Sequence, residues 1–175
     1  MKYLFTAVAL SLTFAVAAQT SLPDSVAMAN ANTQGNTMAQ LLLEKNYTDF
    51  AKYTYPPIIK MAGGEKNMIA IIKKGLDDVE AQGYTFISFS IEKPTKILHL
   101  KNSLQCVVVE NIKMKIPNGK LTTSSALIGV STDKGNNWTF IDTHGADLKS
   151  LQKTIPGLSN DLQMPEKKEP IITKD

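Results

Sequence analysis

The chain has 175 residues, 43% of them hydrophobic and 20% charged, and its formal net charge is +3. This composition is ordinary for a globular protein and excludes a collagen, a coiled coil, a multi-span membrane protein and a wholly disordered chain. All nineteen basic side chains are lysine. Arginine is the usual bidentate partner of phosphate and guanine, so its absence argues against a dedicated binder of nucleic acid or nucleotides.

The first 17 residues have the pattern of an export signal. Lys2 supplies a positive charge, residues 3–16 are uncharged and mostly apolar, and Ala15-Val16-Ala17 fits a small-x-small cleavage site. This apolar run is too short for a comfortable membrane span, and no cysteine lies near the cleavage point to carry a lipid. The sequence therefore predicts a periplasmic or secreted protein with no membrane anchor after cleavage.

Four segments follow from the composition along the chain. A signal peptide is expected over 1–17, a flexible arm over 18–36, a single domain over 37–160 and a flexible tail over 161–175. The arm is predicted because its Ala, Ser, Asn, Thr and Gln residues show no sustained hydrophobic period. The tail is predicted because it is rich in proline and charge.

Within the domain, helical patterns come first and strand patterns afterwards. Apolar residues at helical spacing predict helices over 39–50, 58–61 and 65–82. Period-two alternation then predicts strands over 84–92, 97–100, 104–116, 121–130 and 138–143. A hairpin turn of the Asn-Gly kind is expected at Pro117–Lys120, and a short last helix over 146–154. This order predicts an α+β fold in which N-terminal helices pack on an antiparallel sheet of four to five strands.

The same order resembles the nuclear transport factor 2-like superfamily, which has a cone-shaped, cystatin-like architecture. The resemblance spans about 37–143 and rests on residues 46–50 (NYTDF), 55–59 (YPPII) and 61–65 (MAGGE). It is closest to small secreted bacterial members of unassigned activity, and it implies a curved sheet. Enzymes of the superfamily, such as ketosteroid isomerases and dehydratases, hold acid/base side chains inside the cone. Other members only bind ligands or proteins.

A second resemblance is to the Asp-box hairpin of sialidase-type propellers, because residues 131–138 fit its pattern SxDxGxxW. In such a hairpin Asp133 accepts hydrogen bonds from backbone N–H groups, Gly135 supplies a positive φ, and Trp138 packs beneath the loop. One copy cannot build a propeller, which needs several four-stranded blades. We interpret these three residues as structural, with sugar binding as the alternative.

Glu110 is the first candidate site residue, since it interrupts an apolar face of the predicted 104–116 strand. Inside a cone it would be a desolvated carboxyl with a raised pKa, able to act as a general base. The alternatives are a β-bulge around 107–109 that turns it outward, or a lysine partner such as Lys113.

Asp142 and His144 are the other candidates, two residues apart at the end of a predicted strand. They could form an acid/base pair at a cavity mouth. The alternative is that they cap the loop that follows the strand.

Motifs for catalysis, metals and cofactors are missing from the sequence. The single cysteine, Cys106, lies in an apolar run and is expected to be a buried hydrophobe, and two histidines give no zinc-type spacing. We therefore expect no metal or cofactor and assign no catalytic residue.

The prediction for function is an exported small binding or interaction module. Its partner would be a small apolar ligand in the cone or an envelope protein, and a homodimer could form through the sheet face. One alternative is an isomerase- or hydratase-like enzyme that uses Glu110, or Asp142 with His144. The other is an envelope protein that protects against a toxin.

Overall fold

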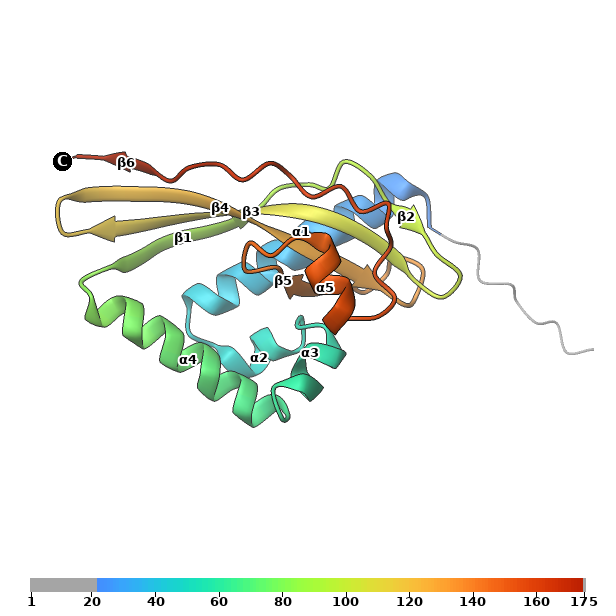
Figure 1. Ribbon diagram of the computed structural model, residues 1–175, viewed down its shortest axis with the longest axis horizontal. Coiled ribbons are helices and arrows are strands. Elements are labelled where there is room, and N and C mark those ends of the chain that lie inside the picture. Colours follow the sequence, from blue (N-terminus) through green and yellow to red (C-terminus); the bar gives the residue numbers. More distant parts are fainter. Residues whose placement is uncertain (1–21, 175) are drawn as a thin grey trace, which may run out of the picture.

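The computed structural model describes residues 22–174, and the predicted signal peptide over 1–17 lies outside them. In this part, N-terminal helices pack on a strongly curled antiparallel sheet, and a short helix follows the sheet (Figure 1). The predicted α+β fold class is confirmed. The elements in chain order are α1 (Asp24–Leu43), α2 (Tyr47–Ala51), α3 (Pro56–Met61), α4 (Glu65–Ala81), β1 (Thr85–Ile91), β2 (Leu98–His99), β3 (Leu104–Ile116), β4 (Gly119–Ser131), β5 (Thr139–Asp142), α5 (Leu148–Thr154) and β6 (Ile171–Thr173).

The long hairpin of β3 and β4 forms the centre of the sheet, each strand being 13 residues long. β1 and β2 pair with β3, whereas β5 and β6 pair with different parts of β4. Because Ile116 pairs with Gly119, the loop of this hairpin consists of Pro117 and Asn118. The hairpin was expected from the sequence, but Gly119 opens the returning strand and does not belong to an Asn-Gly turn.

The first helix corrects the predicted flexible arm over 18–36, because α1 already begins at Asp24. Within the segment predicted as an arm, its buried residues are Ala27, Ala31 and Gly35, spaced four apart and therefore on one side of the helix. Small residues bury little area and give a weak hydrophobic signal, but they let the helix approach the sheet closely. A Cβ added at Gly35 would lie only 3.0 Å from the Ile91 side chain.

Amide side chains on α1 explain why this segment resembles a polar linker. Asn32 and Asn36 donate to the carbonyl oxygen of Ile91, and the Asn36 side-chain oxygen accepts the Ile91 N–H at 3.0 Å. These bonds satisfy backbone groups at the end of β1, where the outer edge of the sheet would otherwise bury them unpaired. The polar composition of α1 thus reflects hydrogen bonding to the sheet.

The predicted tail over 161–175 is also corrected. Leu162 is buried in the protein interior, and residues 171–173 form β6, which pairs with β4. Between them, residues 163–170 have no regular structure and are exposed apart from the half-buried Met164. The C-terminal segment therefore follows the sheet and ends on its edge.

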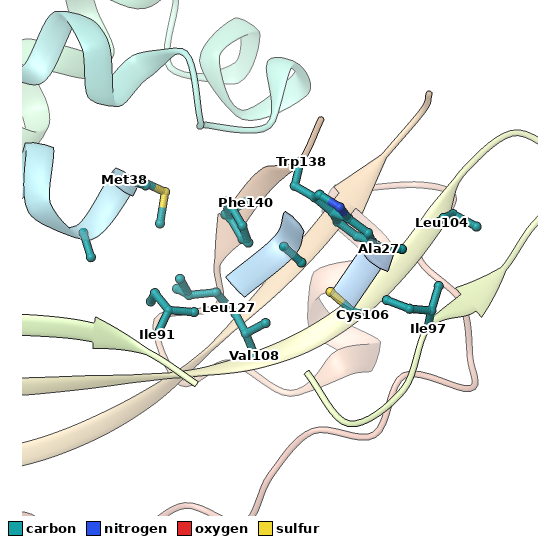
Figure 2. Close-up of a cluster of buried hydrophobic side chains, with 12 residues drawn as sticks. Ala27, Met38, Ile91, Ile97, Leu104, Cys106, Val108, Leu127, Trp138 and Phe140 are labelled. Atoms are coloured by element: carbon teal, nitrogen blue, oxygen red, sulfur yellow. The ribbon is translucent and has the colours of Figure 1, made fainter. Parts of the chain in front are cut away.

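Two apolar cores lie on the two faces of the sheet. The first lies between α1 and the concave face, where Ala27 meets Trp138 and where Cys106 and Val108 extend from β3 (Figure 2). The second lies on the other face, beneath α5 and the segment that follows it. Its buried members are Ile128, Val130, Ile141, Ile155, Leu158 and Leu162. Among residues 22–174, no helix is both long and apolar enough to cross a membrane.

Candidate functional site

The Asp-box hairpin joins β4 to β5 and is held together by its aspartate. The Asp133 carboxylate accepts the backbone N–H of Asn137 at 2.8 Å, the side-chain amide of Asn137 at 2.6 Å and the Ser131 hydroxyl at 2.9 Å. Partial burial opposes ionisation, but the bonds from Asn137 and Ser131 together hold the pKa of Asp133 below its usual value. These are the local bonds that the sequence pattern predicted.

Trp138 closes the hairpin from below. Its ring is 1% exposed, and its indole N–H donates to the carbonyl oxygen of Gly135 at 3.1 Å. Gly135 has φ +91°, a conformation that favours glycine, and its N–H donates to the Ser131 hydroxyl. The loop and the tryptophan are therefore one bonded unit.

The hairpin has a partner that the sequence did not reveal, which is helix α1. Asn30 donates to the Gly135 carbonyl oxygen at 2.9 Å, and Gln34 donates to the Asn136 carbonyl oxygen at 2.7 Å. The side-chain oxygen of Gln34 also accepts the Trp138 backbone N–H. The only sequence signal for this docking is the i, i+4 spacing of Asn30 and Gln34 on the side of α1 next to its small residues.

Removing the aspartate should measurably weaken the protein. We expect Asp133→Ala to lower the free energy of unfolding by about 1–2 kcal/mol, the range for losing a local side-chain cap. Denaturant titration of this variant beside Thr132→Ala, an exposed neighbour in the same loop, would measure the effect. Equal transition midpoints for the two variants would contradict a stabilising role for Asp133.

Glu110 lies on the concave face of β3 and is only 7% exposed. The β3–β4 register runs without a break past it, so the bulge considered around 107–109 is absent. The irregularity of the sheet is instead in β1, between Phe86 and Ser88. Lys113 is exposed and lies on the opposite face by strand alternation, so it is not the partner of Glu110.

The environment of Glu110 disfavours its charged form. Burial, and to a smaller extent the nearby charge of Asp142, raise the pKa of Glu110 to about 7, although a hydrogen bond from Ser125 opposes the change. That bond is long, with 3.3 Å between the hydroxyl oxygen and the carboxylate. Glu110 is thus a buried carboxyl group whose hydrogen bonding to the described residues is weak.

Apolar side chains continue from Glu110 toward the tip of the β3–β4 hairpin. The strand registers place six of them on the same concave face, and each is half-buried. We call this set the outer concave face; it consists of Phe86, Phe89, Ile112, Met114, Ile116 and Leu121. The rings of Phe86 and Phe89 stack with their centroids 5.0 Å apart.

Helix α4 lies on the same side of the sheet as α1 and converges with β1 at the turn between them (Figure 1). Its apolar stripe consists of Met68, Ile69, Ile72, Leu76 and Val79. Only Met68 is buried, and the other four are half-buried. The outer concave face and this stripe are therefore two apolar surfaces on the same side of the sheet that packing within the chain leaves incompletely covered.

Asp142 and His144 do come together, but at the surface. The His144 backbone N–H donates to the Asp142 carboxylate at 2.7 Å, and its ring nitrogen Nδ1 lies 3.3 Å from the second carboxylate oxygen. The imidazole is 85% exposed and the Asp142 side chain 46%. These are the contacts of a loop cap, as in the alternative interpretation. Glu110 lies in the interior whereas His144 lies in solvent, so the two do not form one site.

Tyr47 and Cys106 are two other residues whose titratable group is buried. The Tyr47 hydroxyl is buried without a hydrogen-bond partner among the described residues. The only hint of this in the sequence was that Tyr47 places a polar group on the apolar face of the helix predicted over 39–50. Cys106 is buried, and burial raises its pKa to about 12 despite a backbone hydrogen bond from Gly129. In residues 22–174, no group of three His, Cys, Asp or Glu side chains could hold a metal ion.

Comparison of the sequence with protein-family models and with curated proteins gave no match. The curled sheet with its N-terminal helices is compatible with a cone-like fold. The described residues thus form an α+β half-barrel with an Asp-box-like hairpin between β4 and β5.

Proposed function

We propose that the protein is an exported binding module for a small, mainly apolar molecule. The ligand would lie between the stripe of α4 and the outer concave face, with a polar group against Glu110. Membership of the nuclear transport factor 2-like superfamily and a periplasmic or secreted location are parts of this proposal. They rest on the leader pattern, the motifs of residues 46–65 and the curled sheet.

Glu110 is the observation that carries the proposal. A carboxyl group that is buried without good hydrogen bonds costs free energy, and a single long bond from Ser125 offsets little of that cost. A ligand hydroxyl or amine that donates to Glu110 would supply the missing bond. Ligand sites are mostly apolar with a few placed polar groups, and the half-buried surfaces beside Glu110 have this character.

Ligands that share one chain but differ in the head group test the proposal. The dialysed protein without its leader would be titrated at pH 8 with a fatty alcohol, a fatty amine and a fatty acid of equal length, by thermal shift. We expect the alcohol and the amine to raise the midpoint and the fatty acid to have a smaller effect, because its carboxylate would repel ionised Glu110.

Two variants locate the site in the same titration. Leu76→Lys, which puts a charge on the α4 stripe, should weaken binding at least tenfold, a loss of about 1.4 kcal/mol. Glu110→Gln should abolish the preference for amine over acid, whereas Glu166→Gln, which changes an exposed carboxylate, should keep it. If no compound shifts the midpoint of the wild-type protein, small-ligand binding is wrong.

A further inference from the structure

The C-terminal strand β6 is attached to the sheet almost entirely through its backbone. Its three residues pair antiparallel with Lys120–Thr122 of β4. Ile171 and Ile172 remain 66% and 61% exposed in this position, and they are two of the six exposed large hydrophobic residues of the described chain. Pairing within one copy therefore leaves the apolar side chains of β6 in water.

The edge of β4 is shaped for this strand. A Cβ added at Gly119 would lie 2.1 Å from the carbonyl oxygen of Thr173, so only glycine permits the observed approach of the two backbones. Gly119 also has φ +141°, a value that favours glycine. The register of β6 on β4 is thus specific, although its side chains contribute little burial.

The segment that leads to β6 has the properties of a linker that could let β6 pair with another copy of the chain. Leu162 is its last buried residue, and the eight residues 163–170 have no regular structure and include Pro165 and Pro170. In Figure 1 this connection runs along the sheet to the tip of the β3–β4 hairpin, which projects beyond α1. Residues 163–175 carry three lysines and three acidic side chains, so two such segments would not repel each other.

We propose that β6 exchanges between two copies of this chain, each copy placing its C-terminal strand on the β4 edge of the other. The backbone pairing is the same within one copy and between two, so exchange breaks no contact of the sheet. It brings two projecting hairpins together, and each can then cover the exposed isoleucines of the other. Between its pairing with β6 and the bond from Thr143 to Ala126, β4 also has a stretch of edge over 123–125 that the second hairpin can approach.

Cysteines at one register pair test the exchange in the full chain without its leader. Lys120→Cys and Thr173→Cys are made in separate proteins, because these residues are partners across β4 and β6. The proteins are unfolded, mixed and refolded together at concentrations approaching 1 mM, the order of the effective concentration for a short flexible linker. Mild oxidation then links the two cysteines above the background of random collisions only if they lie on neighbouring strands of different chains. Cys106 is buried and does not interfere.

We expect a disulfide-linked heterodimer, in whose mass spectrum the peptide containing position 120 is joined to the peptide containing position 173. Its yield should be at least tenfold above that of a collision control, in which Lys101→Cys, at another exposed lysine, replaces Lys120→Cys. The double variant Lys120→Cys/Thr173→Cys in one chain calibrates the oxidation. If it closes an internal disulfide while the mixture yields no heterodimer, the exchange is wrong. If neither disulfide forms, the β6 register and the proposal built on it both fail. Ligand titration is unaffected by either result, so this test is independent of the proposed function.

Discussion

Glu110→Gln is expected to stabilise the folded protein at pH 8 by about 2–3 kcal/mol and to change its stability little at pH 4. The folded-state pKa of Glu110 is raised to about 7, above the ordinary value of 4.5 in the unfolded chain. Between these two values the folded protein binds more protons than the unfolded chain, so Glu110 makes the wild-type protein less stable as pH rises. Above pH 7 the loss is complete, and below pH 4.5 it disappears. A neutral glutamine removes this term and can keep the bond from Ser125.

Denaturant unfolding of the wild-type protein and the variant at pH 4, 6 and 8 would measure the difference. The two stability curves should diverge as pH rises, with the variant above. Glu166→Gln, at an exposed carboxylate of the C-terminal segment, should follow the wild-type curve at every pH. Parallel curves for wild type and Glu110→Gln would mean that Glu110 is ionised at little cost, and the observation behind the proposed ligand site would be lost.

Period-two alternation predicted the β3–β4 hairpin well, because a strand that buries one face has apolar residues at every second position of its sequence. The predicted 104–116 strand coincides with β3, and a hairpin turn follows it directly, although the turn consists of residues 117–118 and not of the expected 117–120. The same alternation placed Glu110 on a buried face. It could not show whether a bulge would turn that residue outward, since a bulge depends on pairing with other strands.

The N-terminal part of helix α1, which was predicted as a flexible arm, was missed because its buried residues are small. Ala27, Ala31 and Gly35 contribute little hydrophobicity, and the asparagines and glutamine between them are typical of linkers. Their role depends on groups that lie 55 to 105 residues away in the chain, such as the Ile91 backbone and the Gly135 carbonyl oxygen. A local pattern cannot reveal such partners. The Asp-box was recognised because the bonds of the Asp133 carboxylate join residues that lie close together in the sequence, Ser131 and Asn137.

At the candidate site, too, the sequence predicted the types of residue but not the contacts between distant parts of the chain. The types of residue at 110, 142 and 144 suggested acid/base chemistry, but chemistry depends on burial and distance. The sheet places Glu110 in the interior and leaves His144 in solvent, so the three do not share one environment. The sequence predicted a helix over 65–82 with an apolar stripe, whereas the incomplete cover of that stripe arises from how α4 packs on α2 and α3.

Gly135→Ala should destabilise the protein by about 2–4 kcal/mol, because it meets two independent obstacles. The backbone at Gly135 has φ +91°, which an alanine adopts only with strain. Its Cβ would also lie 2.8 Å from the Ala27 side chain and 3.3 Å from Leu104 Cδ1. Ala27 is fully buried and belongs to a helix that has little freedom to move, so the overlap would push α1 away from the hairpin.

Gly145→Ala separates the two obstacles. Gly145 has a positive φ of 71°, but a Cβ added there meets nothing within 4 Å. This variant therefore carries the backbone strain alone, and we expect it to cost about 1 kcal/mol. The difference between the two variants in equilibrium unfolding reports the packing of α1 on the Asp-box hairpin. If Gly135→Ala costs no more than Gly145→Ala, then α1 does not press on the hairpin as the structure places it, and helix α1 would have to be held by the sheet alone.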